Sequence, residues 1–338
     1  MNGLILLTGG AGYIGSHTAH ALQQAGYQVL ILDAFVHRQA YGKPSLATVI
    51  KGNLGNRTLL DNIFQRYPIT AVMHFAGLIE VGESVKHPDA FYRNNVVYTL
   101  GLLDVMRAHG VKKFIFSSTC ALYGNPHYML MDEKHPLLPQ SPYGNTKLAV
   151  ELALQDYARA YDLAYVALRY FNAAGALPDH GLGECHQPET HVIPLLLRAA
   201  AQRAPFTVHG TDYDTPDGTC VRDYIHVYDI ARAHLLALQY LESGQPSDVF
   251  NLGTGSGFSV RQLIDKAQEV CGIPIVVQEK DRRPGDVATL IADARKAATI
   301  LHWQPEHSAL DTILKSAWRW EMRMAKYHND VKQEKFAA

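Results

Sequence analysis

Residues 4–15 read LILLTGGAGYIG, and this stretch decides the fold. Its first part, Leu4 to Leu7, is a continuous apolar run, which is typical of a strand buried on both faces of a parallel sheet. Glycines follow at positions 9, 12 and 15, and residues 16–25 have the pattern of a helix that closes at Gly26. A strand, a glycine turn and a helix in this order predict the first unit of a doubly wound, Rossmann-type α/β fold.

The glycine turn also predicts a ligand. Glycines let the backbone approach a pyrophosphate, whose negative charge is stabilised by the N–H groups at the start of the following helix. The second strand, residues 29–33, ends in Asp33. A carboxylate there can bind the ribose 2'-hydroxyl of NAD and repel the 2'-phosphate of NADP. The sequence therefore predicts NAD binding, although Arg38 lies near enough to leave NADP open.

Strands and helices continue to alternate through the first half of the chain. We expect strands at 47–51, 71–75, 114–119 and 166–172, and helices at 57–66 and from Pro88 to Gly110. Thr119 ends the strand at 114–119, at the sheet edge where ligands meet open parallel sheets. Its hydroxyl can bond a substrate oxygen and relay a proton, or it can simply cap the strand.

Tyr143 and Lys147 stand four residues apart at the start of a strongly helical segment, so their side chains should share one helix face. A free phenol has a pKa of about 10, and a nearby ammonium favours the phenolate. With a cationic nicotinamide as well, the pair could supply a general base near neutral pH. The alternative is two side chains that merely share an exposed face.

The composition of the chain favours small molecules as its binding partners. Among 338 residues, 31 Lys and Arg balance 32 Asp and Glu without a basic block, so we expect no nucleic acid and no membrane partner. No apolar run is long enough to span a bilayer, and no signal peptide is visible, which favours a cytoplasmic protein. The four cysteines are scattered, as reduced thiols are. Cys185, His186 and His191 come closest to metal ligands but lack zinc-site spacing, so we predict no metal.

The glycine turn, Thr119 and the Tyr143–Lys147 pair together resemble the extended short-chain dehydrogenase/reductase family in order and separation. This resemblance implies a catalytic group of Thr119, Tyr143 and Lys147, with Asn94 in support and Lys147 also on the nicotinamide ribose. The cofactor contacts that it implies are Gly9, Gly12, Tyr13, Ile14, Gly15, Asp33, Asn53, Leu54, Phe75, Ala76, Gly77, Asn94, Lys147 and Phe171.

Three later segments, 169–175 (RYFNAAG), 217–227 (DGTCVRDYIHV) and 282–286 (RRPGD), resemble the UDP-sugar 4-epimerases of that family. The resemblance implies reversible C4 epimerisation of UDP-glucose and UDP-galactose through a 4-keto intermediate with tightly bound NAD. The substrate contacts that it implies are Thr119, Tyr143, Asn172, His191, Val192, Arg222, Arg283, Asp286 and Leu290.

Several alternatives stay open. Asn53 and His191 depart from the commoner residues at these positions, which leaves their ligand contacts in doubt. Each arginine alone could be a surface ion pair, and Leu290 could be ordinary core. The substrate could also be a UDP-N-acetylhexosamine or a UDP-pentose. A nucleotide-sugar dehydratase is less favoured, because its Asp-Glu pair after the threonine is replaced here by Cys120-Ala121.

The resemblance also implies the domain organisation. We expect an NAD-binding domain at 1–171 plus about 219–244, and a UDP-sugar domain at about 172–218 plus 245–327. Residues 328–338 should form a frayed tail. The helices that begin near Pro88 and Tyr143 are where relatives pair, which implies a homodimer.

Overall fold

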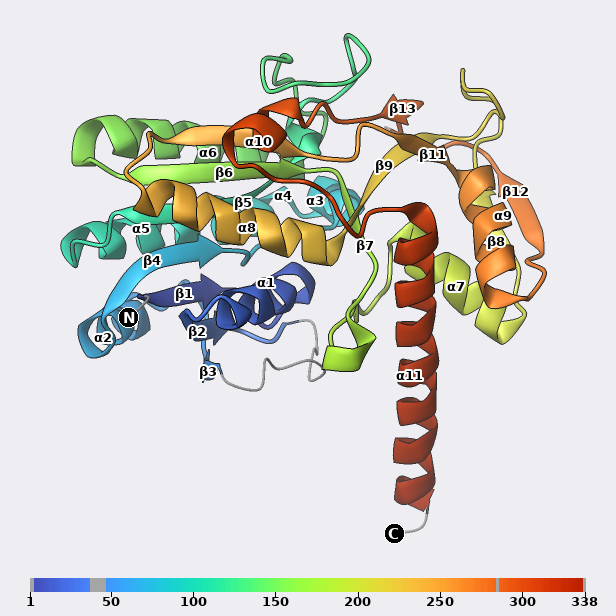
Figure 1. The fold of residues 1–338 in the computed structure, drawn as a ribbon, viewed down its shortest axis with the longest axis horizontal. Helices are drawn as coiled ribbons and strands as arrows, with labels where there is room; N and C mark the ends of the chain where they lie inside the picture. The colour runs from blue at the N-terminus through green and yellow to red at the C-terminus, as the bar shows by residue number, and fades with distance from the viewer. Residues whose placement is uncertain (1–2, 37–46, 284–285, 337–338) are drawn as a thin grey trace.

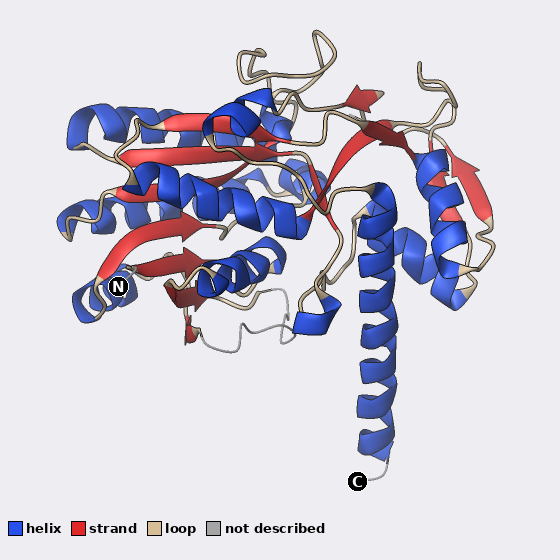
Figure 2. Ribbon diagram, in the orientation of Figure 1, coloured by secondary structure: helices blue, strands red, loops and turns tan. Residues whose placement is uncertain are grey.

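The computed structural model describes residues 3–36, 47–283 and 286–336. Its largest part is a seven-stranded parallel sheet in the order β10-β6-β5-β4-β1-β2-β3 (Figures 1 and 2). The chain winds outward in both directions from β1, which confirms the doubly wound fold. The strands are β1 (Leu4–Thr8), β2 (Gln28–Asp33), β3 (Thr48–Lys51), β4 (Ile69–His74), β5 (Lys113–Thr119), β6 (Ala164–Tyr170) and β10 (Asp248–Leu252).

Helices cover both faces of this sheet. On one face lie α1 (Tyr13–Gln24) and α8 (Val227–Glu242), and on the other α2 (Arg57–Arg66), α5 (Tyr98–Ala108) and α6 (Pro142–Tyr161). Side chains of β1 alternate between the two cores, with Ile5 and Leu7 in one and Leu6 in the other. This double burial explains why Leu4 to Leu7 are all apolar.

The long helix expected from Pro88 is interrupted. It consists of α4 (Pro88–Phe91), a π-helical turn η1 (Tyr92–Val97) and α5, and it is preceded by α3 (Val81–Lys86). A π-turn inserted into a helix often marks a functional position. Here it places Asn94 and Asn95 beside the segment that follows β4.

A smaller unit follows. Its four-stranded sheet joins β7 (Asn172–Ala174), β9 (Val221–His226), β11 (Gly257–Ser259) and β13 (Thr289–Leu290), and a separate pair joins β8 (Phe206–His209) to β12 (Val277–Lys280). The helices α7 (Val192–Gln202), α9 (Val260–Cys271) and α11 (Leu310–Phe336) share one core with β7, β8, β9 and β11. No helix in the described parts of the chain combines the length and hydrophobicity that a membrane crossing requires.

The chain crosses between the two units at points that differ from the expected boundaries. β10 pairs with β6 in the large sheet, and α10 (Arg295–Ile300) packs beside β10, although we placed both in the second domain. β9 belongs to the small sheet, although we placed it in the first. A short strand carries no local signal of the sheet that it joins, so these crossings were not readable from sequence.

The expected tail differs as well. α11 continues through residues 328–336, where we predicted a frayed end. The segment VKQEK at 331–335 contains mostly good helix formers, and that propensity was underrated against its charge.

Candidate active site

A cavity of about 490 Å³ opens at the carboxyl edge of the large sheet, between it and the smaller unit. All the predicted cofactor contacts line this cavity. Five of the nine predicted substrate contacts line it too. The predicted residues in its wall are Gly9, Gly12, Tyr13, Ile14, Gly15, Asp33, Asn53, Leu54, Phe75, Ala76, Gly77, Asn94, Thr119, Tyr143, Lys147, Phe171, Asn172, His191 and Val192.

The glycine turn forms one end of the cavity, and its shape requires glycine. Gly9 has a φ of +70°, and a Cβ atom there would lie 2.5 Å from the backbone nitrogen of Ala76. A Cβ on Gly15 would lie 2.5 Å from the carbonyl oxygen of Gly9. The helix that follows has Gly12 as its N-cap, with no capping side chain and no acidic residue in its first turn. Its first N–H groups therefore suit a pyrophosphate.

Asp33 lies at the end of β2 on the same wall. One carboxylate oxygen accepts a hydrogen bond from the backbone nitrogen of Ala11 at 3.0 Å, and the other from that of Phe35 at 2.8 Å. These bonds hold the acid beside the glycine turn, where a ribose hydroxyl could reach it. Arg38, which left NADP open, lies outside the described residues.

The Thr119–Tyr143 pair sits where β5 ends and α6 begins. Ser141 caps α6 by accepting the backbone N–H of Gly144 at 3.2 Å, and Pro142 occupies the first turn. The Thr119 hydroxyl oxygen accepts the backbone N–H of Ala121 at 3.2 Å, which leaves its own O–H for a hydrogen bond with the Tyr143 phenol. The strand end and the helix start thus bring the two hydroxyls together.

Lys147 lies one turn further along α6 and is 3% exposed. Its ammonium donates to the carbonyl oxygen of Ser117 at 2.8 Å and lies 6.0 Å from the centre of the Tyr143 ring. Burial lowers the pKa of Lys147 to about 8, although Glu151 opposes this shift.

The electrostatics of Tyr143 differ from the expectation. Burial raises the pKa of its phenol to about 12, and the hydrogen bond with Thr119 only partly opposes this. The ammonium of Lys147, which we expected to favour the phenolate together with a cationic nicotinamide, does not outweigh burial in this arrangement. The lysine is itself desolvated and is bonded to Ser117, so burial decides the direction.

Asn95 is a buried supporting residue that the sequence reasoning missed. Its amide nitrogen donates to Leu78 O at 2.9 Å and to Thr146 Oγ1 at 3.2 Å, and its amide oxygen accepts from Leu78 N at 2.8 Å. It thus ties the segment after β4 to α6, and it also accepts from Asn94 at 3.0 Å. A regular helical pattern could not reveal this, because the π-turn changes which side chains face inward.

The structure also places Ser117, Tyr170 and His186 on the cavity wall, which we had not named as contacts. The Ser117 and Tyr170 hydroxyls bond each other across neighbouring strands. The sequence contained a signal for both residues, since Ser117 belongs to the hydroxyl-rich end of β5 and Tyr170 to the quoted segment RYFNAAG. His186 had only been weighed as a metal ligand.

Four predicted substrate contacts, Arg222, Arg283, Asp286 and Leu290, do not line the cavity. Arg222 donates to its own Val221 carbonyl at 2.9 Å and lies 3.9 Å from a carboxylate oxygen of Asp286. Arg283 lies 3.7 Å from the other oxygen of Asp286. Leu290 pairs with Arg222 between β13 and β9 and packs against the core. The two guanidinium groups thus face one carboxylate instead of the cavity.

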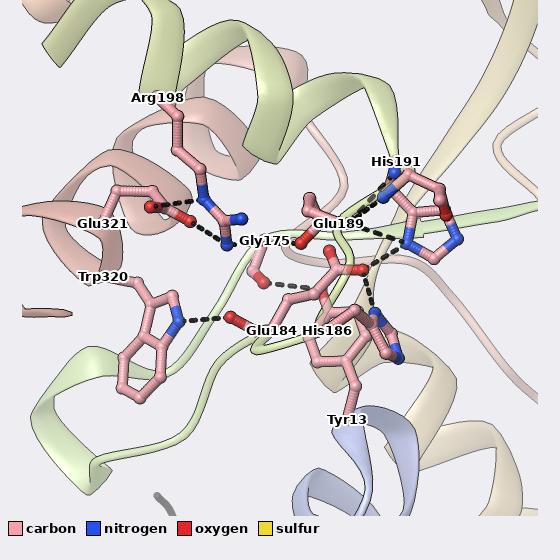
Figure 3. Close-up of polar contacts among 10 residues, drawn as sticks. Tyr13, Gly175, Glu184, His186, Glu189, His191, Arg198, Trp320 and Glu321 are labelled. Atoms are coloured by element: carbon pink, nitrogen blue, oxygen red, sulfur yellow. Dashed lines mark hydrogen bonds and ion pairs between the residues drawn. The ribbon is translucent and has the colours of Figure 1, made fainter. Parts of the chain in front are cut away.

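On the side of the cavity facing α7, a loop brings Glu184, His186, Glu189 and His191 together, with donor atoms within 4.8 Å of one another (Figure 3). Both histidines line the cavity. The Glu184 carboxylate accepts from His186 Nδ1 at 2.9 Å and from His191 Nδ1. These donors came closer together than the sequence spacing suggested, because the loop folds back onto α11, where Trp320 donates to Glu184 O at 2.8 Å.

Comparisons with known proteins agree with this geometry. Residues 5–253 match the NAD dependent epimerase/dehydratase family. The UDP-glucose 4-epimerase of Halalkalibacterium halodurans is 49% identical over 317 residues, which cover 94% of this chain and 95% of the relative. That of Rhizobium meliloti is 48% identical over 324 residues, or 95% and 98% of the two chains.

Two solved structures are also similar. UDP-glucose 4-epimerase from Brucella ovis in complex with NAD has a TM-score of 0.89 at 44% identity, covering 94% of this chain and 98% of that one. The enzyme from Bifidobacterium longum in complex with NAD+ and UDP has a TM-score of 0.88 at 37% identity, covering 95% and 98%. The chain therefore belongs to the NAD dependent epimerase/dehydratase family and, within it, to the UDP-glucose 4-epimerases.

Proposed function

We propose that the chain catalyses the reversible C4 epimerisation of UDP-glucose and UDP-galactose with NAD as its resident cofactor. The observation that carries this function is that Thr119, Tyr143 and Lys147 line the same cavity as the glycine turn. The glycine turn and Asp33 would hold NAD, which would supply a hydride acceptor and donor for C4 and a positive charge that favours the phenolate of Tyr143.

The protein's own residues handle the proton. Tyr143, as phenolate, takes the proton of the sugar 4-hydroxyl as the C4–H bond breaks, which leaves a ketone at C4. The Thr119 hydroxyl donates to the Tyr143 oxygen and so stabilises its negative charge. Once the keto sugar presents its other face and regains hydride, Tyr143 returns the proton to the new alkoxide. The configuration at C4 is inverted, and no net oxidation occurs.

Substrate anchoring is assigned to the smaller unit. Arg222 and Arg283 are suited to a diphosphate, because guanidinium groups form paired, charge-assisted hydrogen bonds with phosphate oxygens. In the arrangement described above both face Asp286, so binding of the UDP moiety requires them to exchange this ion pair for contacts with the ligand. Asn172, at the start of β7, lies on the cavity wall and completes this side.

The decisive experiment is incubation of the purified protein with UDP-galactose and no added reductant. We expect UDP-glucose to accumulate until the two sugars reach equilibrium. A 4-keto-6-deoxy product would instead indicate a dehydratase. An absence of any sugar conversion by NAD-loaded protein would contradict the proposed function.

A homodimer is part of the proposal. Tyr92 and Val97 of η1 and Leu152 of α6 are exposed apolar side chains on adjacent helices, with Val97 58% exposed. A second copy of this chain would bury them. Light scattering should give twice the monomer mass, and Val97→Asp should shift the protein towards monomer. A cytoplasmic location also fits the four cysteines, which are all free thiols.

A further inference from the structure

The loop of residues 184–191 holds an ionised pair against the cavity. The Glu184 side chain is 5% exposed, whereas that of His191 is 46% exposed and lines the cavity. Figure 3 shows the Glu184 carboxylate between His186 and His191. A buried carboxylate requires partners of opposite charge or several donors, and these two rings provide them.

Three carboxylates near His191 favour its cationic form, while the His186 ring lies 5.3 Å from the His191 ring on the other side of Glu184. Glu184 bonds its Nδ1 atom, Glu189 Oε1 lies 3.7 Å from the same atom, and Glu80 contributes from the segment before α3. Burial opposes the charge, yet the pKa of His191 rises to about 9. The pKa of Glu184 falls to about 2, although burial alone would raise it, because His186 and His191 donate to it.

The remaining charges of this cluster are already matched. Arg198 on α7 lies 3.3 Å from Glu189 and bonds Glu321 of α11 at 3.1 Å. The other carboxylate oxygen of Glu189, Oε1, accepts hydrogen bonds from the backbone nitrogens of Thr190 and His191, at 2.9 and 3.0 Å. The His191 ring is thus held from behind, while its exposed side meets the cavity.

We propose that Glu184 is a positioning residue that keeps His191 as an imidazolium on the cavity wall, where the ring binds a diphosphate. Two diphosphates would enter this cavity, one in the cofactor and one in the nucleotide sugar, and this inference rests on the proposed function. The cofactor diphosphate is matched by the glycine turn and the uncapped start of α1. The imidazolium is therefore assigned to the diphosphate of the UDP-sugar.

The test is calorimetric titration of the NAD-loaded protein with UDP between pH 7.5 and 10. A group whose pKa is raised on folding is charged below that pKa, so affinity of the unmodified protein should be constant to about pH 9 and then fall. In Glu184→Gln the ring should return towards its ordinary pKa of about 6.5. Glu189 and Glu80 still favour the charged ring, so the fall in affinity should begin at a lower pH than in the unmodified protein, and UDP affinity at pH 7.5 should drop by up to about tenfold, as expected for loss of a charge-assisted hydrogen bond.

A double-mutant cycle separates positioning from folding. In a His191→Asn background, Glu184→Gln should have no further effect on UDP affinity, and the fall above pH 9 should disappear. An effect of Glu184→Gln that persists in that background, or an unchanged pH profile in Glu184→Gln alone, would overturn the inference. Thermal unfolding of each variant identifies any that fail to fold, and Glu184→Asp then serves as the conservative replacement that should restore part of the affinity.

The NAD content of each variant shows whether His191 binds the diphosphate of the cofactor or that of the nucleotide sugar. We expect it to be unchanged, and a loss of NAD with normal UDP affinity would overturn the assignment to the substrate. Epimerase activity of the unmodified protein is measured first. If that activity is absent while the pH profile of UDP binding is as predicted, the proposed function fails and the role of Glu184 stands.

Discussion

The two walls of the cavity differ in how completely they are assembled. On the large-sheet side, Thr119, Tyr143 and Lys147 converge from a strand end and a helix start, and their hydrogen bonds are made within that side. On the small-sheet side, Arg222 and Arg283 face Asp286 and do not line the cavity. The catalytic groups of the first wall are in place without the substrate, while the two arginines of the second wall are paired with a carboxylate.

This difference has a physical basis. The carboxyl ends of parallel strands lie along one edge, so residues there converge once the sheet forms. Arg283 and Asp286 instead lie between the short strands β12 and β13, and their side chains are 59% and 32% exposed, so few buried contacts fix them. We therefore expect changes on the large-sheet wall to alter turnover and changes on the other to alter substrate binding.

The largest effect should come from Tyr143→Phe. This change removes the group that takes and returns the proton, and general acid–base catalysis contributes about 10²- to 10⁴-fold. We expect kcat to fall by about that factor while NAD and UDP still bind, measured by NAD content and by UDP titration. Near-normal turnover in this variant would break the assignment of chemistry to the large-sheet wall.

The next effect concerns the support beneath that wall. Glu151 of α6 and Arg169 of β6 form a buried ion pair at 2.5 Å, and Ser118 donates to the same carboxylate at 2.5 Å. Removing one partner leaves a buried charge uncompensated, which typically costs about 3 to 5 kcal/mol. Glu151→Gln should therefore lower the free energy of unfolding by about 3 kcal/mol.

The matched control is Glu83→Gln. Glu83 pairs with Lys86 at 2.8 Å, but both side chains are at least half exposed, so the change should lower the free energy of unfolding far less than Glu151→Gln does. Denaturant unfolding of both variants measures the contrast. Equal losses would mean that the pair beneath the catalytic helix is no more important than a surface pair.

Part of the fold and of the site could be predicted from the sequence, and part could not. The strands and the glycine turn rest on local patterns, whereas Thr119, Tyr143 and Lys147 as a catalytic set rest on the family resemblance; the structure places the glycine turn and these three residues in one cavity. The π-turn that turns Asn95 inward, and the Glu184–His191 bond, depend on backbone geometry and on a loop folding back. No local pattern encodes either. The direction of the Tyr143 pKa also required burial, which only packing defines.

The next effect in size concerns the pH dependence of the stability of the fold. His74 at the end of β4 is 1% exposed and lies between the Thr8 and Thr99 hydroxyls, and burial lowers its pKa to about 3. The unfolded chain binds a proton at this site below about pH 6.5. His74 therefore stabilises the fold above that pH, and this contribution is lost as the pH falls towards 3.

Between pH 6.5 and 5 the loss should be about 2 kcal/mol for this site. The difference in unfolding free energy between pH 6.5 and 5 should shrink by about that amount in His74→Asn, relative to the unmodified protein. His191 is the internal contrast, because its pKa is shifted upward and it stays charged throughout this range. An identical pH dependence in the His74 variant would show that its proton affinity is unchanged by folding.

The smallest effect is expected at Leu290 on the small-sheet wall. This side chain was predicted to set the room beside the C2 substituent of the sugar, yet it does not line the cavity and packs against the core beside Arg222. Inserting atoms into a packed wall costs about 1 to 3 kcal/mol, and we expect the lower end here. UDP-galactose should thus be preferred over UDP-N-acetylgalactosamine by about 5-fold in kcat/KM.

Leu290→Ala and Leu290→Cys should reduce this preference, whereas Leu290→Tyr should increase it. Rates on both sugars decide the point, because parallel changes would mean that Leu290 only packs the fold. A selective change would instead show that the small-sheet wall moves towards the sugar when UDP binds.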